Sequence, residues 1–312
     1  MRASNYPARS ILIVDTSPFE QSLMLLPALR RLRSEYPNAF IVAATATGTA
    51  QLLAAAGLIQ GSIDMGALRG AGGSGWKWLG FVRRVRRYDF DLVLDFNPQL
   101  GTQLVARLML RVRTVSASAG PDIVATLMGA SRMVRAGRSQ TRYEALLGRL
   151  ALTLDDGQLR APLPREESDR FEAVLDRSGF RGGELLALLH SPGVNVRSCW
   201  PLAQYSELAT RLARDFGVRI VVADEPGDES FTGLLGALLP SGSVRLAEPA
   251  ALQLVAAVAR ASVVVTTSKG VTQLAAELGS PTVDPLDRST DDVIDDVAER
   301  LQASRSTSLF TR

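Results

Sequence analysis

A short hydroxyl-rich turn is the stretch of this sequence best suited to bind a charged ligand. It consists of Thr267, Ser268, Lys269 and Gly270. A helix that begins at such a turn presents unpaired N–H groups and a partial positive charge, which favours a phosphate group. Lys269 adds a full charge and is one of two lysines in a chain with 33 arginines. The turn is therefore predicted to bind phosphate, and the alternative is an ordinary capped helix.

The residues on either side of the turn predict a buried parallel strand and a following helix. Residues 263–265 are three valines, and Leu274, Ala275 and Leu278 recur at helical spacing before Gly279 ends the pattern. Strand and helix patterns alternate in this way along the whole chain. Further strands are predicted at 11–14, 40–44, 63–65, 92–96, 112–115, 185–190, 218–223 and 244–246. Further helices are predicted at 23–36, 49–58, 76–88, 102–110, 141–152, 171–179, 202–216, 231–239, 251–260 and 291–303.

This alternation predicts an α/β protein with two doubly wound domains. The length of 312 residues suits two domains, and the charged, proline-containing segment at 155–169 is the predicted boundary region. Residues 18–22 are predicted to form a turn, and the next helix either begins near Pro27 or is kinked there. The glycine-rich segment at 70–75 is predicted to be a loop, because no strand precedes it and the dinucleotide-binding spacing is missing.

Composition points to a protein of the cytoplasm. Cys199 is the only cysteine, which excludes an internal disulfide and fits a reducing compartment. No apolar run approaches the roughly 18 residues that a membrane span needs. No group of histidine, cysteine and carboxylate residues has metal-ligand spacing, so no metal site is expected. His190, the only histidine, is expected to end a strand with a hydrogen bond.

The charge of the chain is unevenly distributed. Residues 1–150 contain 19 Lys and Arg against 9 Asp and Glu, a net charge of +10, whereas residues 151–312 contain 16 against 23, a net charge of −7. A basic first half suggests an anionic partner, either a phosphorylated or lipid-linked molecule or an acidic membrane surface, although a solvated basic face is the simpler explanation. Nucleic acid is not expected, because no recognition motif is present and aromatic residues are few.

The first half of the chain contains two characteristic segments, ILIV followed by PALRRLRSEYPNA, and RYDFDLVLDF. Together with three further segments, they resemble glycosyltransferase family 9, the bacterial heptosyltransferases that build the lipopolysaccharide core. TRYEALLGRLAL and HSPGVNVRSCWPLAQYSELATRLA are similar to the end of the family's first domain and the start of its second. LAAELGSPTV, after the phosphate-binding turn, is similar to the family's L-A-A-A-L-G-[TS]-P-T-V. The resemblance covers nearly the whole chain.

The resemblance implies the GT-B fold, with two doubly wound Rossmann-like domains facing each other across a cleft. Residues 1–160 would form the acceptor domain and residues 161–312 the nucleotide-sugar donor domain. The implied reaction is an inverting, metal-independent transfer of a sugar from a nucleotide-sugar to a glycan or lipid-linked acceptor of the lipopolysaccharide type. The nucleotide-sugar is a co-substrate, so no cofactor is expected. A cytoplasmic protein with peripheral contact to the inner membrane would suit such an acceptor.

The residues at the family's reactive positions differ in this chain. The aspartate that serves the family as base falls on Gln21, and an amide cannot accept the proton. Glu20 is the substitute carboxylate in the same loop, and Asp15 is the other nearby one. The family's lysine before its W-P pair falls on Ser198, and Arg197 would supply the missing charge.

The phosphate-binding turn departs from the family pattern as well. The family's Asp, Thr and His fall on Ser268, Lys269 and Gln273, whereas Gly270 is kept. Two hypotheses follow. The chain is a glycosyltransferase whose turn at 267–270 and Arg197 hold the donor diphosphate, or it is a noncatalytic binding or scaffold relative that has lost the catalytic residues.

Overall fold

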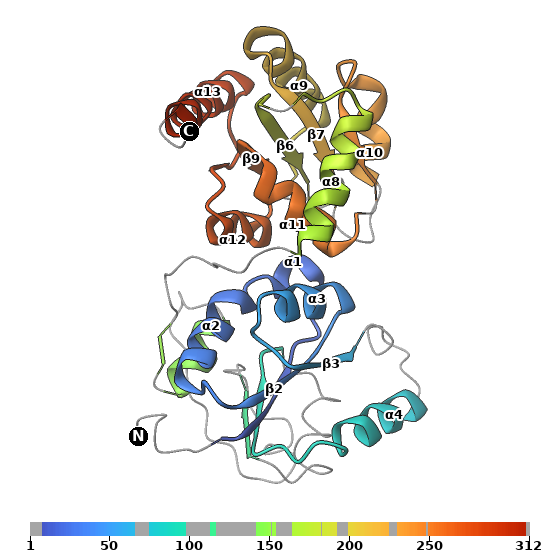
Figure 1. Ribbon diagram of the computed structural model, residues 1–312, viewed down its shortest axis with the longest axis vertical. Coiled ribbons are helices and arrows are strands. Elements are labelled where there is room, and N and C mark those ends of the chain that lie inside the picture. Colours follow the sequence, from blue (N-terminus) through green and yellow to red (C-terminus); the bar gives the residue numbers. More distant parts are fainter. Residues whose placement is uncertain are drawn as a thin grey trace. The chain divides into compact units, whose positions relative to one another are not determined.

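The computed structural model describes residues 8–65, 75–97, 113–116, 142–150, 152–153, 164–181, 183–191, 199–224, 230–247 and 249–309 (Figure 1). The chain divides into two compact units. The first comprises Met1–Pro18 and Met24–Gly157, and the second comprises Phe19–Leu23 and Gln158–Arg312. The predicted boundary between residues 160 and 161 lies outside the described residues, as do the predicted helix at 102–110 and most of the glycine-rich loop.

The amino-terminal half alternates strands with helices. Its strands are β1 (Ser10–Val14), β2 (Phe40–Thr45), β3 (Gly61–Asp64), β4 (Leu92–Asp95) and β5 (Arg113–Ser116). Its helices are α1 (Phe19–Ser22), α2 (Leu25–Glu35), α3 (Thr47–Ala55), α4 (Gly75–Val85) and α7 (Arg142–Arg149).

The carboxyl-terminal half repeats this alternation. Its strands are β6 (Leu186–His190), β7 (Arg219–Ala223), β8 (Val244–Leu246), β9 (Val263–Thr266) and β10 (Thr282–Val283). Its helices are α8 (Arg165–Arg177), α9 (Leu202–Phe216), α10 (Ser230–Leu235) with the short 3₁₀ helix η4 (Gly236–Leu238), α11 (Ala251–Arg260), α12 (Lys269–Leu278) and α13 (Thr290–Leu309).

The two sheets have the same topology. The first has the strand order β3-β2-β1-β4-β5, and the second, read from the corresponding edge, has the order β8-β7-β6-β9-β10. The strand pairs in both sheets are parallel. In each sheet the strand order reverses direction at the central strand, so the switch points lie between β1 and β4 and between β6 and β9. At such points the loops diverge and leave room for a ligand at the carboxyl ends of the strands.

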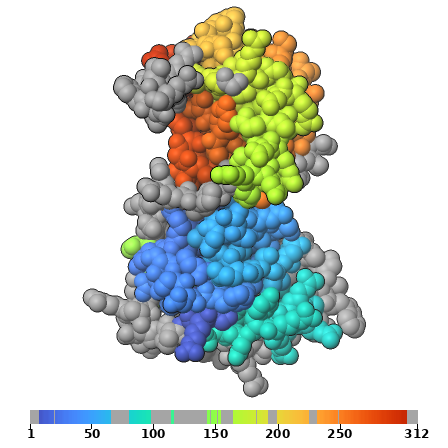
Figure 2. All heavy atoms as spheres, in the orientation of Figure 1, coloured from blue at the N-terminus to red at the C-terminus, as the bar shows by residue number. Residues whose placement is uncertain are grey.

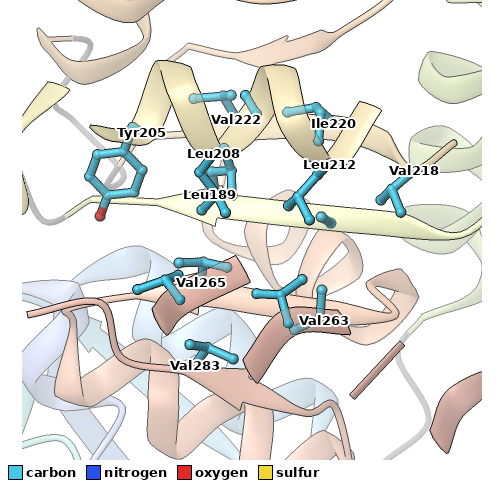
Figure 3. Close-up of a cluster of buried hydrophobic side chains, with 14 of the residues drawn as sticks. Leu189, Tyr205, Leu208, Leu212, Val218, Ile220, Val222, Val263, Val265 and Val283 are labelled. Carbon is cyan, nitrogen blue, oxygen red and sulfur yellow. The ribbon is translucent and has the colours of Figure 1, made fainter. Parts of the chain in front are cut away.

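The core of the second unit shows why its strands and helices form where they do. Alternate residues of β6, β7 and β9 face α9, and the leucines of α9 recur at helical spacing on the side that meets the sheet (Figure 3). The cluster includes Leu189, Val222 and Val265 from the strands and Leu208 and Leu212 from α9. This packing fixes which strand-end side chains point toward the opposite face.

The first unit is built in the same way. Leu12, Val14, Val42 and Ala44 of β1 and β2 form a buried cluster that includes residues of α4. The right-handed connections from β1 through α2 to β2, and through α3 to β3, place α2 and α3 on the other face of the sheet. The alternate strand residues, including Thr45, therefore point toward the face that carries α2 and α3.

Two predictions about the first loop and helix need comment. Residues 18–22 were predicted to be a turn, but Phe19–Ser22 form the short helix α1. The turn prediction is wrong there because the Leu23 N–H donates to the Phe19 carbonyl oxygen at 3.1 Å and closes a helical turn, and the Ser22 hydroxyl donates to the same oxygen at 2.7 Å. Pro27 lies in the first turn of α2, whose N–H groups have no intrahelical acceptor in any case. The helix thus begins near the proline.

Candidate functional site

The switch point of the second sheet carries a chain of polar contacts at the ends of β6 and β9. His190 and Thr266 are paired residues of these strands, and both are buried. The His190 Nδ1 atom lies 3.0 Å from Thr266 Oγ1, which confirms the hydrogen bond expected for this histidine. Thr266 Oγ1 also accepts the Ser268 N–H at 3.0 Å. The two strand ends therefore fix the start of the turn.

Ser268 connects this turn to α12. It is the N-cap residue in extended conformation, and its hydroxyl oxygen accepts the Val271 N–H at 3.1 Å. Its carbonyl oxygen accepts the Thr272 hydroxyl at 2.9 Å. These bonds fix Ser268 between the end of β9 and the first turn of α12.

The remaining groups of the turn are hydrogen-bond donors and one ammonium group. The Thr267 hydroxyl oxygen is buried and has no hydrogen-bond partner in the part of the chain that the structure describes. Lys269 is exposed, and Gly270 follows it in the first turn of α12. The N–H groups of this first turn have no carbonyl partners four residues back within the helix. The structure therefore brings together Thr267, Ser268, Lys269 and Gly270, four of the five residues predicted to bind phosphate.

Arg197, the fifth residue, lies outside the described residues, together with Ser198. The described neighbours of that segment are Ser191, which is buried at the end of β6, and Cys199, whose Sγ lies 3.4 Å from the Ser191 hydroxyl oxygen. Gln273, at the position of the family's histidine, donates from its amide to Oε1 of the buried Glu277 at 2.9 Å. The Gln273 amide is therefore used in a hydrogen bond within α12.

The switch point of the first sheet carries a second polar cluster, centred on Asp15. The Asp15 side chain is fully buried, and its Oδ1 accepts the Ser17 N–H at 3.0 Å and the Ser17 hydroxyl. Its Oδ2 accepts the Tyr143 hydroxyl at 3.2 Å. Asn97, which follows β4, donates to Thr16 Oγ1 at 3.1 Å and to Ser17 Oγ at 3.2 Å. Both oxygens of Asp15 are therefore used inside the fold.

The other two residues of the first loop lie in α1. The backbone of Glu20 is in this helix, and its side chain lies outside the described part. Gln21, at the position of the family's catalytic aspartate, is exposed. The catalytic assignments of Glu20 and Asp15 stay predictions.

Sequence reasoning missed the partners that complete these clusters. Asn97 and Tyr143 were not singled out, although Asn97 is two residues beyond β4, where switch-point side chains belong. Asp224, which directly follows β7, was not assigned to such a cluster either; it is buried, and its Oδ1 accepts the N–H groups of Phe231 and Thr232 at 2.9 Å each. Residues 225–229 lie outside the described residues.

Three aromatic side chains pack together near the carboxyl end of β6, the central strand of the second sheet. The Tyr205 ring contacts Trp200 edge to face at 5.0 Å between centroids and Phe231 at 4.8 Å. The Tyr205 hydroxyl donates to the His190 carbonyl oxygen at 3.2 Å. Burial raises the pKa of Tyr205 well above its ordinary value, with smaller effects from Cys199 and Asp284. Tyr205 therefore stays protonated and acts as a fixed donor at the end of β6.

The described residues contain neither a metal-binding cluster nor a membrane-spanning helix. Within the described ranges, no three His, Cys, Asp or Glu side chains lie close enough to hold a metal ion. None of the helices in the described part is both long and apolar enough to cross a membrane.

Comparison with known proteins places this architecture among solved structures. No protein-family model matches the chain, and no curated protein sequence does. The glycosyl transferase family 9 protein from Veillonella parvula DSM 2008 superposes with a TM-score of 0.76 over 97% of this chain and 98% of that chain, at 15% identity. The chain has the GT-B fold.

Two heptosyltransferases give the same result for this GT-B chain. E. coli ADP-heptose lps heptosyltransferase II matches with a TM-score of 0.69 and 18% identity over 95% of this chain and 99% of that chain. E. coli heptosyltransferase WaaC with ADP matches with a TM-score of 0.64 and 20% identity over 95% of this chain and 98% of that chain. The fold implied by the resemblance to glycosyltransferase family 9 is thereby confirmed, at identities that fit a divergent sequence.

Proposed function

We propose that this GT-B protein transfers a sugar from a nucleotide-sugar to a glycan or lipid-linked acceptor. The observation that supports the proposal is the turn from Thr267 to Gly270 at the second switch point. It begins a capped helix, its Thr267 hydroxyl has no partner among the described residues, and its Lys269 is exposed. One of the similar solved structures, E. coli heptosyltransferase WaaC, contains ADP, which is a nucleoside diphosphate. Arg197 completes the diphosphate site in this proposal.

The proposed mechanism is inverting and needs no metal. The ammonium of Lys269 and the helix N–H groups stabilise the negative charge that develops on the departing nucleoside diphosphate. Glu20 accepts the proton of the acceptor hydroxyl as general base. Glu20 is preferred to Asp15 in this role, because both oxygens of Asp15 already accept hydrogen bonds inside the fold.

The first test is nucleotide binding. Replacing Lys269 by alanine should weaken the binding of ADP or UDP about tenfold, since one charge-assisted contact is lost at an exposed position. Lys269→Arg keeps the charge and should bind more tightly than Lys269→Met, which keeps only the apolar stem. Isothermal titration calorimetry on the full chain measures all three. If the unmodified protein binds no nucleotide, the proposal fails.

Two residues favour the noncatalytic alternative. The same protein preparation can be used to distinguish it from the enzyme. Gln21 stands where the family has its base, and the Gln273 amide is engaged with Glu277. A protein that binds nucleotide yet neither hydrolyses nor transfers sugar from any nucleotide-sugar offered to it would be a binding or scaffold relative. Transfer to any acceptor excludes this alternative.

We further propose that the protein contacts an anionic membrane through a basic surface next to α4. The surface consists of Arg83, Arg84, Arg86 and Arg87, all exposed, while Phe81, Val82 and Val85 of α4 are buried in the core. Figure 2 shows α4, in teal, at the surface of the first unit. Phe40, which is 41% exposed, stacks on Tyr88 at 6.0 Å between centroids. Arginines beside an aromatic side chain suit an anionic lipid headgroup region.

This surface predicts a charge-dependent affinity for vesicles. Arg83→Gln with Arg87→Gln should weaken binding to phosphatidylglycerol-containing vesicles roughly thirtyfold, since each arginine near such a surface contributes about 1 kcal/mol. Co-sedimentation measures the change. Arg165→Gln with Arg177→Gln removes two exposed arginines from the second unit and is the matched control. Equal binding to neutral phosphatidylcholine vesicles would contradict the proposal.

A further inference from the structure

The ends of the second strands in the two sheets are equivalent positions occupied by different residues. Ala44 of β2 and Ala223 of β7 each pair with the end of the central strand of their sheet. Thr45 follows Ala44, and Asp224 follows Ala223. Both point to the face of their sheet that carries the next helix, because the preceding alternate residues, Val42 and Ala44 in β2, lie in the cluster on the opposite face.

In the second unit, the chain supplies its own anion at this position. The Asp224 carboxylate is buried and accepts the N–H groups of Phe231 and Thr232 at the start of α10, together with the Thr232 hydroxyl. A carboxylate satisfies the unpaired N–H groups and the partial positive charge of a helix start. In the second unit, the side chain at this strand end therefore contacts the N-terminus of the next helix.

In the first unit, the same place holds a neutral hydroxyl. Thr45 is fully buried, and its Oγ1 has no hydrogen-bond partner among the residues described. The Thr45 carbonyl oxygen accepts the Met65 N–H at 3.0 Å, whereas the Thr45 hydroxyl makes no hydrogen bond to the described residues. An unpaired buried hydroxyl costs stability, so a ligand that accepts its proton would stabilise the fold.

The helix that follows Thr45 is ready for such a ligand. The N-cap residue of α3 is Ala46, which has no side-chain hydrogen bond to the helix. The N–H groups of Thr47 and Gly48 belong to the first helical turn and have no intrahelical acceptor. Thr47 is exposed and Gly48 is half-buried, so solvent reaches this helix start.

We propose that the N-terminus of α3, together with the Thr45 hydroxyl, binds a phosphate group, which takes the place of the carboxylate that Asp224 supplies in the second unit. The phosphate accepts the Thr47 and Gly48 N–H groups and the Thr45 hydroxyl. The inference goes beyond the proposed sugar transfer and does not depend on nucleotide binding at Lys269. The net charge of +10 on residues 1–150 favours the approach of an anion.

One charge opposes the ligand and provides a sensitive test. Asp64 of β3 pairs with Thr45 and is exposed. Its carboxylate repels a phosphate nearby, although water screens the interaction. Asp64→Asn is therefore expected to bind phosphate more tightly than the unmodified protein.

The experiment follows the amide signals of Thr47 and Gly48 by NMR spectroscopy while inorganic phosphate is added to the full chain. These two signals should shift and saturate. Thr45→Val keeps the shape and removes the hydroxyl, so phosphate binding should weaken about tenfold or more while Tm stays equal or rises. Thr45→Ser keeps the hydroxyl and should bind as the unmodified protein does. Thr45→Asp supplies an internal carboxylate and should abolish the response to phosphate.

Lys269→Ala serves as the background in which the phosphate-binding turn of the second unit is weakened, so the two anion sites are distinguished. Glucose 1-phosphate is titrated in parallel. If it shifts the same two signals at lower concentration than inorganic phosphate, the site takes a phosphorylated sugar; if inorganic phosphate alone does so, the site takes the free ion. The proposal is overturned if neither compound shifts the two amides, or if Thr45→Val responds as the unmodified protein does.

Discussion

Replacing Trp200 by alanine is expected to lower the free energy of unfolding of the second unit by about 3–5 kcal/mol. The Trp200 side chain is 2% exposed and contacts Tyr205 edge to face. Its indole N–H donates to the Arg288 carbonyl oxygen at 3.1 Å. The substitution leaves a large cavity in a well-packed core and an unpaired carbonyl group between β10 and α13. Denaturant unfolding of the full chain, followed by circular dichroism, measures the loss.

The control for Trp200 keeps most of the packing. Trp200→Phe retains an aromatic ring and removes the donor to Arg288 together with part of the ring volume, so it should cost clearly less than the alanine variant. The chain has two units, so two unfolding transitions can be resolved. In that case the loss of unfolding free energy should appear in only one of them, the transition of the second unit. A loss below about 1 kcal/mol for Trp200→Ala would contradict the packing described for this core.

Replacing Asp15 by alanine should lower the free energy of unfolding of the first unit by about 3 kcal/mol. The substitution leaves the Ser17 N–H, the Ser17 hydroxyl and the Tyr143 hydroxyl without their acceptor in a buried place. Tyr143→Phe removes one of these donors cleanly and should cost about 1 kcal/mol. Thermal and denaturant unfolding of the unmodified protein, Tyr143→Phe and Asp15→Ala should show stability decreasing in this order.

The Asp15 variants also decide between two roles for this residue. If Asp15 holds the first loop in place, Asp15→Asn should lower stability, and any loss of transfer should accompany it. If Asp15 is the general base, Asp15→Asn should lower the rate by about 10²–10⁴ with stability nearly unchanged. The second result would remove Glu20 from the proposed mechanism.

The strands and helices were predictable because their signals are local. The three valines of β9 predict a buried strand, and the spacing of the leucines of α9 predicts an amphipathic helix, without information from the rest of the chain. The helices α9 and α11 have the predicted bounds, 202–216 and 251–260. Three of the described elements depart from the prediction. The helix α1 and the strand β10 have four and two residues, too few for a hydrophobic period to appear. The helix α8 begins at Arg165 rather than at residue 171, because its charged first turns resemble the linker that was predicted at 155–169.

The candidate site was predictable only in its continuous part. The turn from Thr267 to Gly270 is one segment between a strand and a helix, so its residues had to lie together. His190 and Thr266, by contrast, are 76 residues apart, and Asp15 and Tyr143 are 128 apart. Nothing in the periodicity of the sequence says which strand ends are neighbours, since strand order is set by the handedness and packing of the connections.

The sequence by itself thus determined the order of strands and helices, the two-domain α/β class and a helix start suited to phosphate. The tertiary structure decided which polar groups are already used. Asp15 and Asp224 are carboxylates whose hydrogen bonds lie within the fold, whereas the hydroxyls of Thr45 and Thr267 have no partner in the described part of the chain. The physical reason is that burial makes every polar group require a partner, and only the folded arrangement shows which partners the chain itself provides.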